Sequence, residues 1–151
     1  MRKIICILAL LGLATPLFAA DPFLGTWKLD PAKTKYTTGT PAKDVTLVIE
    51  EQGDSYQVTA TGTYQDGSPI SVKYTVPKAG GAGTAQEGPF DAVTSKRVSA
   101  HVRENRYTKN GKEIVSRRIV VSQDGKTLKI TVKGTDPQGK PVAGVDVFDK
   151  Q

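Results

Sequence analysis

The sequence has very little of the chemistry that most metal and redox sites need. Its 151 residues include one cysteine, Cys6, and one histidine, His101. Zinc and haem sites usually draw several ligands from these two residue types. The sequence therefore indicates no metal site and no cofactor, and we expect His101 to be an exposed turn residue.

Sequence motifs of known catalytic sites are absent as well. There is no Gly-x-Ser-x-Gly elbow, no Ser-x-x-Lys or His-Glu-x-x-His motif, and no glycine-rich phosphate loop that opens a helix. We therefore predict that the protein is not an enzyme. The alternative is a hydrolase whose two carboxylates meet only in the folded chain, since the sequence holds 15 acidic residues.

The sequence also lacks an apolar run long enough to span a membrane. Its strongest apolar run, 4–13, follows two basic residues and precedes a segment that ends in small residues at Ala20. This pattern is typical of a secretory signal peptide. We predict that residues 1–20 are a signal peptide that contains Cys6, and that residues 21–151 form one periplasmic or secreted domain without stable membrane insertion.

The predicted mature domain is large enough to fold without disulfides. A domain of this size buries about two thirds of the surface that its unfolded chain exposes. Without Arg2 and Lys3 it carries 19 basic and 15 acidic side chains, a formal charge of +4. Such a charge only weakly favours anionic partners.

Glycines at regular intervals are the strongest structural signal in the sequence. Two blocks repeat at a spacing of 14 residues, namely Gly53, Gly67 and Gly81, and Gly111, Gly125 and Gly139. Asp-Gly and Asn-Gly pairs occur in several of these positions, and they tolerate the positive φ of tight hairpin turns. The sequence therefore predicts a meander of antiparallel strands.

Alternation of apolar and polar residues supports the same interpretation, and no segment has a helical period. We predict strands at 23–30, 92–98, 102–108, 113–122, 126–135 and 141–148. From Asp44 on, alternating apolar residues indicate further strands, with Val45, Leu47 and Ile49 on one face, then Tyr56, Val58 and Ala60, and beyond Pro69 the residues Ile70, Val72, Tyr74 and Val76. A turn without glycine is expected near residues 99–101. We expect an irregular connection at 31–43 and a flexible tract with weak strand propensity at 77–91.

Strands with one apolar face must bury that face. A closed barrel does so and also removes the edges of the sheet. Because nearly all predicted connections are short, we predict an all-β fold, a single antiparallel up-and-down β-barrel of about 9–10 strands. A two-sheet sandwich is the alternative.

The segment Phe23-Leu24-Gly25-Thr26-Trp27-Lys28-Leu29 resembles the opening strand of the calycin superfamily, which includes lipocalins and fatty-acid-binding proteins. The resemblance implies that Gly25 and Trp27 close one end of the barrel, with Lys150 where lipocalins place a late arginine on the tryptophan. Both ends of the chain are similar to those of exported bacterial lipocalin-like proteins. Fatty-acid-binding proteins often hold the ligand carboxylate with Arg and Tyr on the last strand, and the matching residues here are Asp146 and Phe148.

Several side chains are candidates for the lining of a ligand cavity. Arg117 shares its parity with Val115, Ile119 and Val121, although Ile114 and Val120 have the opposite parity, so its face stays open. A cavity arginine could receive a carboxylate or phosphate. We predict the cavity candidates Tyr56, Tyr64, Tyr74, Arg117 and Phe148.

Basic residues are frequent between Lys96 and Arg118, with eight Lys or Arg against two Glu. Such a stripe could attract an anionic envelope surface such as lipid head groups. Nucleic acid is not expected as a partner, because only Tyr107 is available for stacking in this stretch.

These features together predict an exported, monomeric lipocalin-like barrel that binds a small and largely hydrophobic ligand in its interior, as a passive carrier or a sequestering protein. The alternative is a protein-interaction module of the envelope with a filled barrel and a basic surface.

Overall fold

The computed structural model describes residues 19–151, so most of the predicted signal peptide, including Cys6, lies outside the described residues. The described chain is all-β. Its strands are β1 (Gly25–Leu29), β2 (Lys35–Thr38), β3 (Ala42–Gln52), β4 (Ser55–Tyr64), β5 (Pro69–Pro77), β6 (Gly81–Ala82), β7 (Thr84–Glu87), β8 (Ala92–Arg97), β9 (Val102–Lys109), β10 (Lys112–Val121), β11 (Thr127–Thr135) and β12 (Pro141–Lys150).

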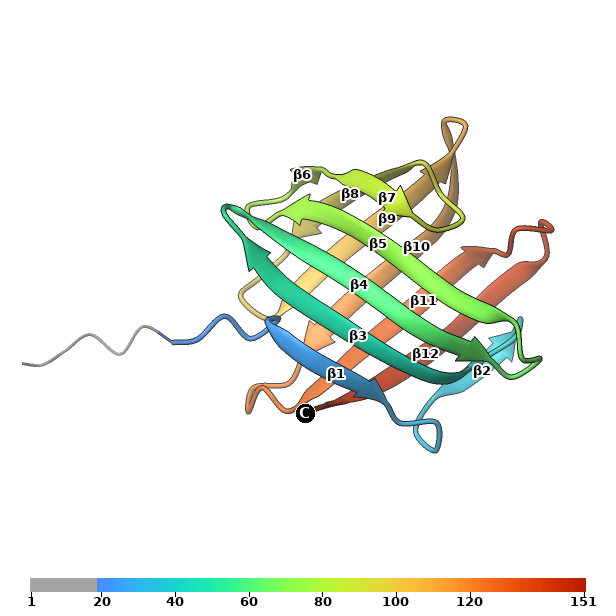
Figure 1. Ribbon diagram of the computed structural model, residues 1–151, viewed down its shortest axis with the longest axis horizontal. Helices are drawn as coiled ribbons and strands as arrows, with labels where there is room; N and C mark the ends of the chain where they lie inside the picture. Colours follow the sequence, from blue (N-terminus) through green and yellow to red (C-terminus); the bar gives the residue numbers. More distant parts are fainter. Residues whose placement is uncertain (1–18) are drawn as a thin grey trace, which may run out of the picture.

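The strands form one antiparallel up-and-down sheet that curls into a barrel (Figure 1). Strands β3 to β5 and β8 to β12 each pair with their neighbours in sequence, and β1 joins the two runs by pairing with both β12 and β3. Figure 1 shows β1, β3, β4 and β5, blue to green, in front of β8 to β12, yellow to red. The predicted barrel is thus confirmed.

A short segment between β5 and β8 bridges the two ends of this sheet. Strand β6 pairs with β8, and β7 pairs with β5. Gly83 lies between them, and a Cβ at this position would come within 2.1 Å of the Thr75 carbonyl oxygen. The expectation of a flexible tract with weak strand propensity at 77–91 was therefore wrong, because tertiary pairing outweighs local propensity here.

The predicted number of strands, about 9–10, was too low for a related reason. Residues 19–151 form 12 strands, of which β2, β6 and β7 are short. The predicted irregular connection at 31–43 contains β2, which pairs with β12. Isolated four-residue segments give little sequence signal, because a neighbouring strand supplies their stability.

The glycine spacing marks real turns at most positions. Asn110 and Gly111, between β9 and β10, have φ of 50° and 76°, as the predicted Asn-Gly hairpin turn requires. The turn without glycine lies at 98–101, close to the expected place. Gly81 keeps the spacing but begins β6 and is not part of a tight hairpin.

The two ends of the barrel differ. The mouth is the end bordered by the turns at 65–68, 110–111 and 136–140. The closed end is bordered by the turns at 53–54, 98–101 and 122–126, and Phe23 is buried there in the core. In the described residues, 19–151, no helix is long and apolar enough to cross a membrane.

Candidate functional site

The barrel encloses a cavity that extends from its mouth toward its middle. This outer chamber has a volume of about 250 Å³. A deeper chamber of about 40 Å³ lies toward the closed end. Leu47, Ala60 and Val72, on three adjacent strands, line both chambers because their side chains share the inward parity.

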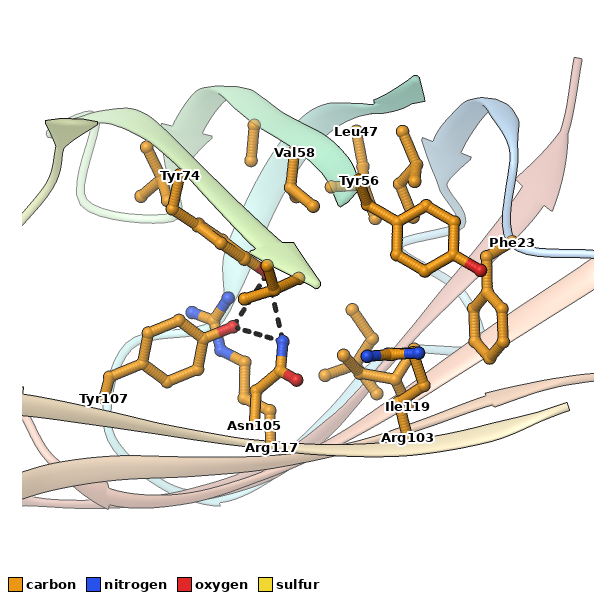
Figure 2. A pocket seen from close by; sticks show the side chains of 15 residues that line it. Phe23, Leu47, Tyr56, Val58, Tyr74, Arg103, Asn105, Tyr107, Arg117 and Ile119 are labelled. Carbon is orange, nitrogen blue, oxygen red and sulfur yellow. Dashed lines mark hydrogen bonds between the residues drawn. The ribbon is translucent and has the colours of Figure 1, made fainter. Parts of the chain in front are cut away.

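A hydrogen-bonded group of polar side chains lies between the two barrel walls near the deeper chamber (Figure 2). The hydroxyl oxygens of Tyr74 and Tyr107 are 2.9 Å apart, and the Asn105 amide donates to both at 3.3 Å. Burial raises the pKa of Tyr74 well above its ordinary value, so its phenol stays protonated. Phe90 packs against both tyrosine rings from the loop between β7 and β8.

Arg117 on β10 points into the barrel beside this group (Figure 2). Its guanidinium lies over the Tyr107 ring, 5.1 Å from the ring centre. Its Nε is buried and has no hydrogen-bond partner in the described part of the chain. Burial disfavours the charged form, but Tyr107, Tyr74 and Asp146 outweigh it and raise the pKa of Arg117, so its charge is retained.

An irregularity in β10 explains why the sequence left the face of Arg117 open. The pairing of β10 with β9 shifts register between Glu113 and Val115, as at a β-bulge. Ile114 and Val115 are consequently both packed against the core. Beyond this irregularity the alternation is regular, which places Arg117 inside.

Asp146 on β12 supplies an acidic group to the outer chamber. The Tyr36 hydroxyl donates to its Oδ2 at 3.0 Å, whereas its Oδ1 is buried without a partner among residues 19–151. The Tyr36 ring lies directly on Gly144, where a Cβ would come within 2.4 Å of ring atoms. Burial raises the pKa of Asp146, while Arg117 and the Tyr36 hydrogen bond oppose this shift.

Arg117 and Asp146 share the outer chamber without forming a direct pair. No ion pair within 4.0 Å joins them in the structure of residues 19–151. Two residues that line the same chamber therefore each hold a buried polar atom without a partner among residues 19–151.

A second inward-facing arginine, Arg103, belongs to the closed end. It is 3% exposed and donates hydrogen bonds to the Ser95 hydroxyl and to the carbonyl oxygens of Pro77 and Lys78, at 2.7 to 3.2 Å. It also lies over the Tyr56 ring, 5.2 Å from its centre. Arg103 therefore ties β9 to β8 and to the end of β5.

Gly25 and Trp27 lie at the closed end, on β1. Trp27 is fully buried and donates its indole N–H to the Phe23 carbonyl oxygen at 3.0 Å. The Lys150 ammonium is 5.0 Å from the centre of the Trp27 ring, a cation–π distance. Gly25 has a φ of 130°, a backbone conformation that favours glycine.

The other predicted cavity residues fall at different depths. Tyr74 and Tyr56 line the deeper chamber, and the Tyr56 hydroxyl donates to Asp21 at the closed end. Tyr64 lies near the mouth at the end of β4 and lines the outer chamber, as does the buried Phe148. The structure therefore brings Arg117 and Phe148 to the outer chamber but separates Tyr56 from them.

Sequence reasoning did not select Tyr36, Asn105 or Tyr107 as cavity residues, and it treated Asp146 only as a departure from the family pattern. Tyr36 falls in the segment predicted to be irregular. Asn105 and Tyr107 share the inward parity of β9 with Arg103. This alternation was the available signal for the two residues. It is a weak signal because two of the three inward positions, Arg103 and Asn105, are polar rather than apolar.

The stretch from Lys96 to Arg118 does not present all its cations on one surface. Arg103 and Arg117 point inward, and of the exposed cations Arg106 and Arg118 pair with glutamates on neighbouring strands. His101 is in the turn between β8 and β9, where it is half-buried rather than exposed because its Nδ1 lies 3.2 Å from the Val121 carbonyl oxygen. No group of three or more potential metal ligands occurs in the described residues.

No protein-family model matches this chain, and no curated protein matches it. Among solved structures, the chain is similar to EF1p2_mFAP2b bound to DFHBI, with 15% identity and a TM-score of 0.49 over 88% of this chain and 97% of the other. It is also similar to a redesigned β-barrel, mFAP1, bound to DFHBI, with 14% identity and a TM-score of 0.45 over 85% and 95% of the two chains. The strand order and register, rather than these similarities, define the fold.

Proposed function

We propose that this protein binds a small, largely apolar molecule in the outer chamber of its barrel. The observation that carries the proposal is a 250 Å³ cavity with mainly apolar walls and buried polar atoms of Arg117 and Asp146. A cavity of about 150 Å³ already holds benzene in another protein, so the chamber can take a molecule of about two fused rings. Apolar contact would supply most of the affinity, and the polar atoms would orient the ligand.

The chamber supports this function over the alternative of a filled barrel. Its lining includes Tyr64 and Pro69 at the mouth, so a ligand has a short path from solvent. Binding needs no covalent step and no cofactor in this proposal. The protein would act as a passive carrier or as a sequestering protein.

We also propose that the protein is an exported member of the calycin superfamily. The contacts of Gly25, Trp27 and Lys150 at the closed end support the family, because they repeat the arrangement that the resemblance implies. The pattern of residues 1–20 supports export. Mass determination of the mature protein would test export, and an uncleaved N-terminus would contradict it.

The binding proposal can be tested with the uncharged fluorescent probe N-phenyl-1-naphthylamine and a variant that fills the cavity. Ala60 is buried and lines both chambers, whereas its neighbour Thr61 on β4 is exposed. Ala60→Phe should weaken probe binding about tenfold or more, since overpacking removes the space that the probe occupies. Thr61→Phe adds the same ring outside the barrel and should bind like wild type.

Circular dichroism and urea unfolding would verify that both variants are folded. Equal binding by both variants would place the probe outside the barrel and contradict the proposal. Solvent extraction of purified protein followed by mass spectrometry gives an independent test. Absence of any extracted molecule, together with no probe binding by wild type, would favour the filled-barrel alternative.

A further inference from the structure

We infer that the outer chamber selects an electrically neutral ligand whose polar end carries a hydrogen-bond acceptor beside a donor, as an aromatic carboxamide does, and that it disfavours a carboxylate of the same shape. This inference rests on the proposed binding function. It names the chemical class of the ligand rather than only its size and apolarity.

The acceptor on the ligand is required by Arg117. Arg117 lines the outer chamber, and its buried Nε–H has no partner in the described chain. Stacking over Tyr107 fixes the plane of the guanidinium, so the direction of this donor is set before a ligand binds. A buried donor without a partner is costly, and a ligand carbonyl oxygen would remove this cost.

The donor on the ligand is required by Asp146. Tyr36 occupies one carboxylate oxygen, and its ring is held against Gly144, so the other oxygen remains as a fixed acceptor. Arg117 does not reach this carboxylate within ion-pair distance. A ligand N–H is suited to this oxygen, and an amide group presents its N–H beside its carbonyl oxygen.

Charge balance excludes anions from this arrangement. The Arg117 cation and the Asp146 carboxylate both line the outer chamber, which is formally neutral when Asp146 is ionised. A ligand carboxylate would gain from Arg117 but would place a second negative charge near Asp146, which lines the same chamber. Like charges in a site of low dielectric disfavour binding, and this repulsion gives specificity.

The deeper chamber has the same preference. Asn105 donates its amide N–H to the two tyrosines, and its Oδ1 is buried without a partner in the described residues. This oxygen is an acceptor, as is the free oxygen of Asp146. Both chambers therefore favour ligand groups that donate hydrogen bonds, apart from the one acceptor that Arg117 needs.

Three naphthalenes of similar shape test this inference by isothermal titration of the full mature protein. The probes are naphthalene-2-carboxamide, naphthalene-2-carboxylate and 2-ethylnaphthalene, at about pH 7.5, where a carboxylate with an ordinary pKa of about 4 is ionised. We expect the carboxamide to bind about tenfold more tightly than the carboxylate, because an unpaired or repelled polar group costs this much or more.

Asp146→Asn tests the origin of the selectivity. It removes the negative charge beside Arg117, so it should tighten carboxylate binding about tenfold and abolish the preference for the carboxamide. Asp149→Asn is the matched control. Asp149 also lies on β12, but it pairs with Lys33 outside the cavity, so this change should leave both affinities unchanged. If Asp146→Asn does not fold, Asp146→Leu removes the charge with an apolar side chain.

The possible results separate the inference from the function on which it rests. Wild-type binding of the carboxylate at least as tight as that of the carboxamide would overturn the inference while leaving ligand binding intact. An unchanged preference in folded Asp146→Asn would overturn it in the same way. Failure of wild type to bind any of the three probes, including 2-ethylnaphthalene, would contradict the proposed function itself and the inference with it.

Discussion

Arg103 and Arg117 lie on adjacent strands of the barrel, and their surroundings differ. Arg103, at the closed end, donates hydrogen bonds to a serine hydroxyl and two backbone carbonyl oxygens. Arg117, nearer the mouth, stacks on Tyr107 and keeps a buried Nε without a partner in the described chain. The two residues face the same interior, since Arg103 is opposite Ile119 and Asn105 is opposite Arg117 in the β9–β10 pairing.

Arg103 therefore has a structural role, because its donors are used within the protein, whereas Arg117 has a buried donor that a ligand could use. Buried donors are nearly always satisfied, and Arg103 follows this rule within its own chain. Arg117 departs from it at a cavity of about 250 Å³. An unsatisfied buried group is more informative about binding than a buried charge alone.

The largest expected effect is on stability at the closed end. Arg103→Met should lower the free energy of unfolding by about 3 kcal/mol, because two carbonyl oxygens and one hydroxyl lose a charged donor in a buried site. Urea unfolding measures this loss. Arg106→Met, on the same strand but exposed, should change stability by less than about 0.5 kcal/mol. Equal losses in the two variants would contradict a structural role for Arg103.

The next effect is on binding and concerns the other arginine. Arg117→Met should weaken binding of naphthalene-2-carboxamide about tenfold, equivalent to about 1.4 kcal/mol, since the ligand carbonyl loses its donor. It should destabilise the protein less than Arg103→Met does. Titration calorimetry and urea unfolding measure the two quantities. Arg118→Met removes an exposed cation on the same strand and should bind the carboxamide like wild type. Equally weakened binding in both variants would contradict a specific role for Arg117 in holding the ligand.

A smaller effect is expected from the contact that covers Trp27. Lys150→Met should lower stability by about 0.5 to 1 kcal/mol through loss of the cation–π contact, and ligand affinity should stay unchanged. Lys129→Met on β11 is exposed and serves as the control. Weaker ligand binding by Lys150→Met would show that the closed end and the mouth are coupled.

The smallest effect is a pH dependence assigned to Asp146. Because burial raises its folded pKa above the ordinary 3.8, the folded state binds the Asp146 proton more tightly than the unfolded state does. The free-energy cost of burying the ionised Asp146 carboxylate is absent at low pH, where the group is protonated, and it appears as the pH rises through the folded pKa. Relative to Asp146→Asn, wild type should therefore lose stability as the pH rises above the ordinary pKa of 3.8 and through the higher folded pKa. Urea unfolding across this range measures the difference, and a constant difference would contradict the assignment.

Much of the barrel could be predicted because its signals are local. The Asn110-Gly111 turn and the alternation in β3 and β11 depend on residues close together in sequence. Strands β2, β6 and β7 could not be predicted in this way, because their partners lie elsewhere in the chain and supply the pairing. The sequence did not decide which face of its strand Arg117 occupies, because the register shift between Glu113 and Val115 puts apolar residues at both parities.

The sequence by itself determined the class of fold and the positions of most turns, because hairpin chemistry and strand alternation act over a few residues. Only the tertiary structure decided that Tyr36 meets Asp146 across 110 positions and that, among residues 19–151, every Arg103 guanidinium nitrogen is hydrogen-bonded while the Arg117 Nε has no partner. These contacts depend on how the sheet closes and on which side chains then share its interior. The candidate binding site belongs to this second category.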